Sequence, residues 1–136
     1  MISFVLSLLA TVVLLGFVIV TGVRRQRSAH YAGVTAFFAA LGVSIWRARV
    51  FGASGGGLNF AAAATTQLLH RIAIALTFVL VPFLVISGVR LAKATGADEP
   101  ARRRTHHVLA IAFVTLFLVT AALGVVMTLQ ALAATG

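Results

Sequence analysis

The sequence predicts an all-α membrane protein, a four-helix bundle whose helices run up and down across the bilayer. Of the 136 residues, 61% are hydrophobic and only 10% are charged, whereas a soluble domain carries roughly 25% charged residues. The apolar runs reach about 20 residues or more and lack the two-residue alternation of membrane strands. In lipid the backbone polar groups must form hydrogen bonds within the protein, so a spanning segment is either a helix or a strand of a closed barrel. The lack of alternation therefore predicts helices. We expect one membrane domain, 1–136, with helices at about 2–23, 29–50, 66–95 and 101–133.

Basic residues and glycines delimit the first two helices. The run 2–23 has no Lys or Arg before it and exceeds an ordinary signal-peptide core in length, which predicts a retained helix. Ser28 is placed to cap the second helix. Trp46, followed by Arg47, marks the far end of that helix at the membrane interface. The glycine-rich segment 52–57 has the composition of a flexible linker.

Asparagine and proline delimit the last two helices. Asn59 is placed to cap a short helical piece before the third helix. Pro82 is expected to kink the helix 66–95, because proline removes one backbone hydrogen bond. The turn 96–100 contains both acidic residues of the chain, and Pro100 suits the start of the final helix.

The net charge of +9 would suggest nucleic acid as the partner of a soluble protein. Here the basic residues cluster at helix ends, so we expect membrane lipid and no nucleic acid. Eight Lys and Arg residues follow the first and third helices, against three around the loop after the second. The positive-inside rule therefore predicts both termini outside the cytoplasm, in a bacterial inner membrane. The eight are Arg24, Arg25, Arg27, Arg90, Lys93, Arg102, Arg103 and Arg104, and the three are Arg47, Arg49 and Arg71.

The composition also excludes several kinds of chemistry. The chain contains no cysteine, so disulfides, thiolate metal sites and iron–sulfur clusters are excluded. No Asp, Glu or Lys lies in the middle of an apolar run, which disfavours a proton-coupled carrier. No nucleophile–base set or HExxH motif is present. We therefore predict no catalytic residue, and any enzymatic role is limited to a component of electron transfer.

Two similar hexapeptides, 25–30 and 102–107, precede the second and fourth helices. Both read Arg-x-Arg, then Ser or Thr, any residue, and His. In an up-down bundle, His30 and His107 enter the membrane at the same depth on diagonally opposed helices. That diagonal, roughly 13–14 Å, fits the roughly 12–13 Å between the Cα atoms of two histidines that share a haem iron. We therefore predict His30 and His107 as the axial ligands of one non-covalent haem b.

Arginines and the remaining histidines complete the predicted site. Arg27 and Arg104 are expected to pair with the haem propionates, since arginine forms bidentate pairs with carboxylates. His106 competes with His107, and their 100° difference in helical rotation lets only one face the bundle centre. His70 with Arg71 is a candidate site for a quinone headgroup or a five-coordinate haem. The alternative for every histidine is a plain interfacial residue.

Short motifs around these histidines resemble a known family. His70-Arg71, with an apolar run ending in Ser87-Gly88, and Arg104-Thr105-His106-His107, leading into a run with Gly124, resemble segments of small transmembrane b-type cytochromes and related uncharacterised four-helix bacterial membrane proteins. The resemblance implies haem b and electron transfer with quinone or a redox protein. The chain departs from that family because no helix carries two histidines one membrane thickness apart, which disfavours an electron path across the membrane through one chain.

The sequence thus predicts a haem-b-binding membrane protein that relays electrons near the cytoplasmic face, with quinone as one expected partner. The alternative from another class is a cofactor-free accessory or structural subunit of a larger membrane complex, whose Gly- and Ala-rich helix faces dock partner helices. A channel or carrier of a neutral solute is a third and weaker reading.

Overall fold

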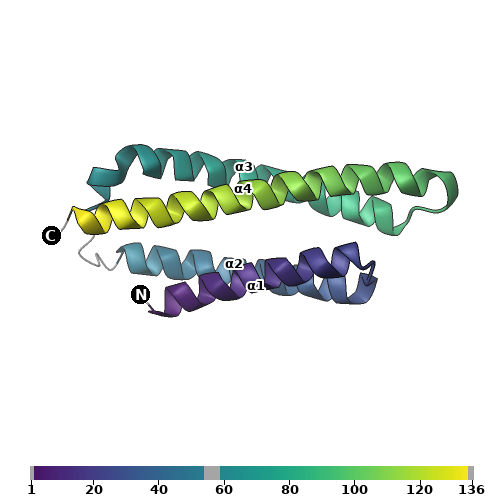
Figure 1. The fold of residues 1–136 in the computed structure, drawn as a ribbon, viewed down its shortest axis with the longest axis horizontal. Helices are drawn as coiled ribbons and strands as arrows, with labels where there is room; N and C mark the ends of the chain where they lie inside the picture. The colour runs from purple at the N-terminus through teal and green to yellow at the C-terminus, as the bar shows by residue number, and fades with distance from the viewer. Residues whose placement is uncertain (1, 54–58, 135–136) are drawn as a thin grey trace. The chain divides into compact units, whose positions relative to one another are not determined.

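The computed structural model describes residues 2–53 and 59–134, and it confirms the predicted all-α fold of four helices (Figure 1). The helices are α1 (Ile2–Val23), α2 (Arg27–Ala53), α3 (Ala64–Ala92) and α4 (Glu99–Ala133). Two short 3₁₀ turns, η1 (Phe60–Ala63) and η2 (Gly96–Asp98), precede α3 and α4. No strand occurs among the described residues. All four helices are long and apolar enough to cross a membrane, so the chain is an integral membrane protein.

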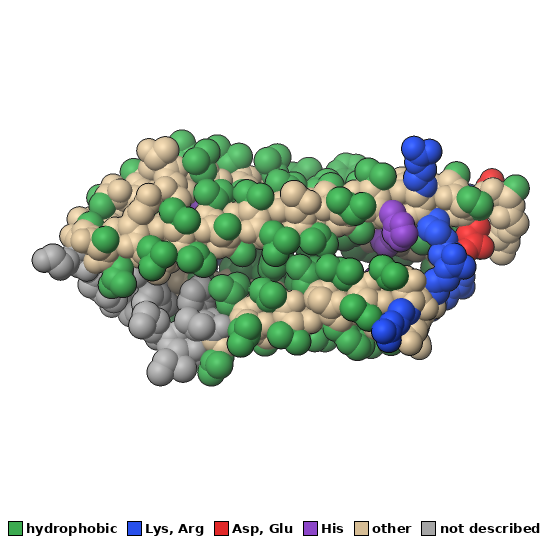
Figure 2. All heavy atoms as spheres, in the orientation of Figure 1, with side chains coloured by type: hydrophobic (Ala, Val, Ile, Leu, Met, Phe, Trp, Pro, Cys, Tyr) green, Lys and Arg blue, Asp and Glu red, His purple; other side chains and the backbone are tan. Residues whose placement is uncertain are grey.

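The chain divides into two compact units, Met1–Gly56 and Gly57–Gly136. The N-terminal hairpin consists of α1 and α2, and the C-terminal hairpin consists of α3 and α4 with both 3₁₀ turns. Apolar side chains line the visible lengths of the helices, whereas basic side chains lie at the turn end of each hairpin and acidic side chains lie beside the turn from α3 to α4 (Figure 2). This distribution suits helices that contact lipid along their length and water at their ends.

The two hairpins repeat the same polar contact between their helices. Thr11 of α1 lies 3.0 Å from Ser44 of α2, and Thr77 of α3 lies 3.4 Å from Thr120 of α4. Each of these hydroxyls also lies 2.7–2.9 Å from the carbonyl four residues earlier in its own helix. In each pair one hydroxyl can therefore donate to that carbonyl and accept a hydrogen bond from the other. Such bonds satisfy hydroxyl groups where no water is present.

The residue numbers show how regular this repeat is. Positions in α3 follow their counterparts in α1 by 66 residues (77 minus 11), and positions in α4 follow those in α2 by 76 (120 minus 44). The same shift of 76 relates Phe37 to Phe113, and both are buried, with 3% and 4% of their surface exposed. The chain is therefore a tandem pair of structurally equivalent helical hairpins.

The turn of the N-terminal hairpin places an arginine in a conformation that usually belongs to glycine. Arg25 has φ = 57°, in the left-handed region. The amide of Gln26 donates to the carbonyl of Thr21 at 2.9 Å, and that of Arg25 to Gly22 at 3.2 Å. This is the Schellman arrangement of a helix end. Since α2 already begins at Arg27, the prediction of Ser28 as the N-cap is wrong, and Ser28 lies in the first helical turn.

Replacing Arg25 with glycine is expected to stabilise the protein by about 0.5–1 kcal/mol, because glycine adopts positive φ without a Cβ penalty. Thermal unfolding in detergent measures the change. Arg27→Gly, which removes the same charge from a helical position, provides the control and should lower stability. Equal effects of the two substitutions would contradict this account of the turn.

The turn of the C-terminal hairpin is longer and contains the acidic residues. Gly96 has φ = 65°, and Pro100 lies in the first turn of α4, as predicted. Two ion pairs brace this first turn, Arg102 with Asp98 at 3.2 Å and Arg103 with Glu99. They join residues four apart on one helix face.

The segment before α3 differs from the prediction in one respect. Asn59 precedes η1 but makes no side-chain capping hydrogen bond. The backbone N–H of Asn59 instead donates to the backbone carbonyl of Ala131 at 3.3 Å. Ala131 is buried, and so is Ala63 in η1. Asn59 therefore ties η1 to the end of α4 through its backbone. The predicted glycine-rich linker lies mostly outside the described residues.

Candidate functional site

Three of the four histidines lie against a glycine of the neighbouring helix in their own hairpin. Each imidazole approaches so closely that a Cβ added to the glycine would stand 3.1–3.3 Å from the ring carbon Cε1. A larger residue at these positions would displace the ring. The pairs are His30 with Gly22, His70 with Gly124 and His106 with Gly88.

Hydrogen bonds from Nδ1 orient two of these rings. His30 Nδ1 lies 3.0 Å from the carbonyl oxygen of Val18, and His70 Nδ1 lies 2.9 Å from that of Thr120. In both cases the carbonyl belongs to the residue four positions before the contacted glycine. Because a carbonyl only accepts hydrogen bonds, Nδ1 must carry the hydrogen. In the neutral ring the lone pair then lies on Nε2.

A serine hydroxyl lies against the Nδ1 of His106. Ser87 Oγ lies 2.8 Å from the carbonyl of Leu84 and 2.9 Å from His106 Nδ1. A hydroxyl has one hydrogen. When that hydrogen is directed at Leu84, Ser87 accepts a hydrogen bond from Nδ1–H of His106, and the lone pair of the neutral ring lies on Nε2. Leu84 again stands four residues before the contacted glycine.

This arrangement has a specific chemical consequence. An imidazole that donates from Nδ1 to an oxygen and carries its lone pair on Nε2 is oriented and made more basic for binding a metal. The same bond satisfies a polar ring inside a membrane, where an unsatisfied one is costly. His30 and His70 are thus held with the hydrogen on Nδ1 and the lone pair on Nε2, and the contact of His106 with Ser87 is compatible with the same tautomer.

The repeat decides which histidine of α4 corresponds to His30. His106 follows His30 by 76 residues, the shift that relates α4 to α2, and each of the two rings lies on the equivalent glycine. His106 is half-buried, whereas His107 is exposed. The hexapeptide alignment had paired His30 with His107. In the structure the equivalent of His30 is His106, and the role of either residue as a ligand stays a prediction.

The predicted propionate partners lie at the start of their helices. Arg27 and Arg104 are both exposed. With His106 as the equivalent of His30, the residue that corresponds to Arg27 is Arg103, whose guanidinium pairs with Glu99. Arg104 itself lies about 200° around the helix from His106, two residues away.

No protein-family model, curated protein or solved structure matches the chain. The structure shows a small membrane protein of four long apolar helices. The resemblance to b-type cytochromes adds an expectation about its cofactor and stays a prediction.

His70 occupies the opposite end of the C-terminal hairpin from His106. Its neighbour Arg71 is exposed. The position equivalent to His70 in α1 is Phe4 (70 minus 66), so the N-terminal hairpin has a histidine at one end only. Within the described part of the chain, no three His, Cys, Asp or Glu side chains gather to hold a metal ion. An axial pair on haem iron needs only two protein ligands.

Sequence reasoning identified the histidines and named Gly88 and Gly124 in the motifs around them, but it did not predict that the imidazole rings contact these glycines and Gly22. The signal was present in the tetrapeptides Thr21-Gly22-Val23-Arg24 and Ser87-Gly88-Val89-Arg90, which end α1 and α3. Both combine a small hydroxyl residue, a glycine, a valine and an arginine. Aligned on these tetrapeptides, α1 and α3 have the register that the structure shows.

Replacing Gly22 with alanine is expected to destabilise the N-terminal hairpin relative to the same change at Gly16. Alanine in a helix gains about 0.5–1 kcal/mol over glycine, and a Cβ at Gly16 meets no atom within 4 Å. At Gly22 the new Cβ would stand 3.1 Å from the His30 ring, so the ring must shift by a few tenths of an ångström. That shift weakens its bond to Val18, at a cost of about 1 kcal/mol or more. The two variants should therefore differ by about 1–2 kcal/mol in thermal unfolding, and identical stabilities would count against the ring–glycine contact.

Proposed function

We propose that this protein binds one haem b, with His30 and His106 as axial ligands, and passes single electrons near the cytoplasmic face. The observation that carries the proposal is the repeat of one site in two hairpins. In each, Nδ1 of a histidine lies at hydrogen-bonding distance from an oxygen and its ring lies on a glycine. A six-coordinate haem iron binds two axial ligands from the protein. Two imidazoles with the same surroundings in two equivalent hairpins suit that role.

The order of the helices supports the proposal that both histidines lie on one side of the membrane. If each of the four helices crosses the bilayer, α1 and α3 run in the same direction, because two crossings separate them. The turns that follow them then lie on one side, and His30 and His106 share one depth. The excess of Lys and Arg in these turns supports the cytoplasmic side, with both termini outside.

The chain's own residues would hold and tune the cofactor. A bound haem b supplies one-electron chemistry. The acceptors of the two Nδ1–H groups, Val18 and Ser87, would make the imidazoles stronger donors to iron and so favour the oxidised state. Arg27 is the proposed partner of one propionate. Arg104 would serve the other only with His107 as the ligand, because Arg104 lies about 200° around α4 from His106. Quinone, for which His70 and Arg71 are the candidate site, or a redox protein would exchange electrons with the haem.

The absorption spectrum of the purified protein tests this proposal. Protein from haem-replete cells should show a Soret band that shifts on reduction, with one haem per chain. A colourless preparation would instead favour the cofactor-free accessory subunit. The orientation is tested separately, since a tag at either terminus should be reachable only from outside the cytoplasm.

A further inference from the structure

A hollow of about 450 Å³ lies in the C-terminal hairpin, between the end of α3 and the start of α4. At the level nearest the turn it is lined by Arg90 and Arg102. The hydroxyl residues Ser87 and Thr105 line it one helical turn further from the connection. The next level is apolar, with Phe83 opposite Leu109, and Ile86 lines the side. The lining thus changes from cationic to hydroxyl to apolar along the helix axes.

We propose that this hollow binds one anionic phospholipid, with the phosphate at the two arginines and an acyl chain along the apolar level. The change in lining follows the change in polarity of such a lipid, from charged headgroup to hydrocarbon, at the depth where bilayer headgroups meet helix ends. The hydroxyl hydrogens of Ser87 and Thr105 are directed at carbonyls of their own helices. Recognition of the charge therefore falls on Arg90 and Arg102.

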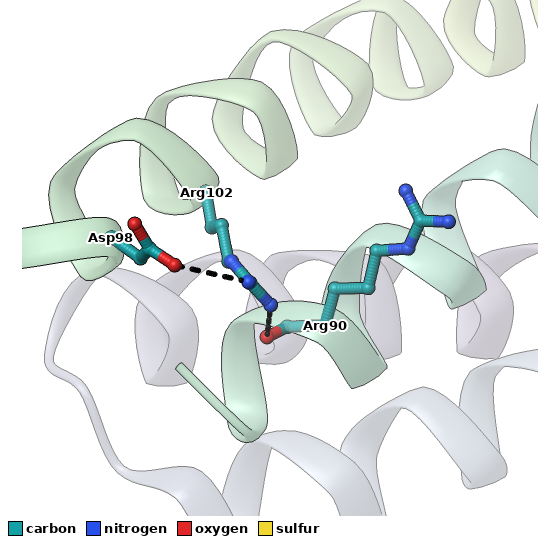
Figure 3. A network of polar contacts seen from close by, with 3 residues as sticks. All are labelled: Arg90, Asp98 and Arg102. Atoms are coloured by element: carbon teal, nitrogen blue, oxygen red, sulfur yellow. Dashed lines mark hydrogen bonds and ion pairs between the residues drawn. The ribbon is translucent and has the colours of Figure 1, made fainter. Parts of the chain in front are cut away.

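The charge balance of the hairpin leaves room for an outside anion. The chain has only two acidic side chains, and these pair with Arg102 and Arg103. Arg102 also donates to the carbonyl of Arg90 at 3.3 Å, near the negative end of the α3 dipole (Figure 3). The guanidinium of Arg90 points away from this network (Figure 3). No third carboxylate side chain exists to balance Arg90, and a lipid phosphate would do so.

The residues that line the hollow differ from their counterparts in the N-terminal hairpin. The counterparts of Phe83 and Leu109 are Phe17 and Gly33 (83 minus 66 and 109 minus 76). Phe17 lies against Gly33 so closely that an added Cβ would stand 2.8 Å from its ring. In the C-terminal hairpin a leucine occupies the place of that glycine, and Phe83 is 57% exposed. The leucine thus excludes the phenylalanine ring and leaves the space open.

The cations differ between the hairpins in the same way. Arg102 corresponds to Gln26 and Thr105 to Ala29 (102 and 105 minus 76), so the N-terminal hairpin lacks one of the two cations and one of the two hydroxyls. Arg90 has an arginine counterpart, Arg24 (90 minus 66). Arg24 lies on an equivalent helix end without the second cation, and it offers a matched control.

Native mass spectrometry of the full chain tests the proposal with two lipids of identical acyl chains. Phosphatidylglycerol should be retained at one molecule per chain, and phosphatidylcholine should not. Arg90→Gln should weaken retention roughly tenfold, equivalent to about 1.4 kcal/mol. Arg24→Gln removes the same charge from the equivalent position and should leave retention unchanged. Ile86→Trp keeps every charge but fills the hollow, and it should weaken retention as well.

Several results would overturn the proposal. Equal retention of both lipids would show that the arginines do not select the headgroup, and equal losses in Arg90→Gln and Arg24→Gln would show attraction by net charge alone. Retention unaffected by Ile86→Trp would place the lipid elsewhere. Displacement of phosphatidylglycerol by millimolar inorganic phosphate would reveal an anion site without a lipid chain. None of these variants changes a histidine, and lipid retention is measured separately from haem absorption. The proposal of a lipid site can therefore be overturned without affecting the proposal of a haem site, and the reverse.

Discussion

His106→Ala is expected to abolish the haem absorption of the purified protein, and His30→Ala is expected to do the same. Each substitution removes one of the two proposed axial nitrogens, on rings whose Nδ1 lies 2.9–3.0 Å from an oxygen of the same hairpin. Changes to the groups that merely orient a metal-binding histidine cost roughly 10–100-fold in affinity. Loss of the ligand itself should therefore lower the haem content of each variant by more than about tenfold, measured as Soret absorbance per milligram of protein.

His107→Ala provides the matched control for this prediction. It removes the same side chain one position along α4, from an exposed site, and should leave the absorption intact. The reverse pattern, with haem lost in His107→Ala and kept in His106→Ala, would show that the equivalence of the two hairpins does not identify the ligand. Far-ultraviolet circular dichroism of each variant separates loss of haem from loss of fold.

The existence and extent of the helices could be predicted because lipid imposes a simple rule. Backbone groups must be bonded internally, so each long apolar run becomes a helix. The expected bounds agree with the structure within three residues. The errors in the predicted bounds occur at helix ends, where local hydrogen bonds determine which residue is the last in the helix. Arg25, rather than a glycine, takes the left-handed position that ends α1, and no pattern of hydropathy indicates this.

The histidines of the candidate site were identifiable, but their partners were not. The Arg-x-Arg hexapeptides align His30 with His107 in sequence. Which side chain meets the neighbouring helix depends on helical phase, and adjacent residues differ by 100°. The phase of α4 relative to α3 is set by contacts along both helices, including Thr77 with Thr120 and His106 with Ser87. These contacts join residues 19 to 43 positions apart, beyond the reach of a short motif.

Comparison of the two hairpins separates the features that both of them have from those that only one of them has. The turn sides of both hairpins keep the histidine, the glycine and the preceding hydroxyl residue. At the far ends only the C-terminal hairpin has a histidine, His70, and the hollow described above lies beside the turn of that hairpin. The histidine, glycine and hydroxyl residue that both hairpins have suit the proposed haem site, which uses both hairpins. His70 and the hollow suit the proposed quinone and lipid sites, which use the C-terminal hairpin alone.

Phe113→Ala is expected to destabilise the C-terminal hairpin by roughly 2–3 kcal/mol. Phe113 is 4% exposed, and its ring stacks on that of Phe117 with centroids 6.3 Å apart. Truncation of a buried phenylalanine costs about 3–5 kcal/mol in soluble cores. The expected cost is lower here because the unfolded helix exposes the side chain to lipid rather than water, so the loss comes from packing alone. Denaturation by SDS in mixed micelles measures it.

The same substitution at Phe37 should cost a similar amount, because this residue occupies the equivalent buried position two helical turns after His30. Phe78→Ala is the control, since Phe78 is 54% exposed and its truncation should change stability by about 0.5 kcal/mol or less. If Phe37 and Phe113 differ widely in cost, the hairpins share a sequence pattern without sharing a packing scheme. Similar costs would show that a buried phenylalanine at the same position stabilises each pair of helices. In each hairpin that packing would maintain the register in which the histidine contacts its glycine.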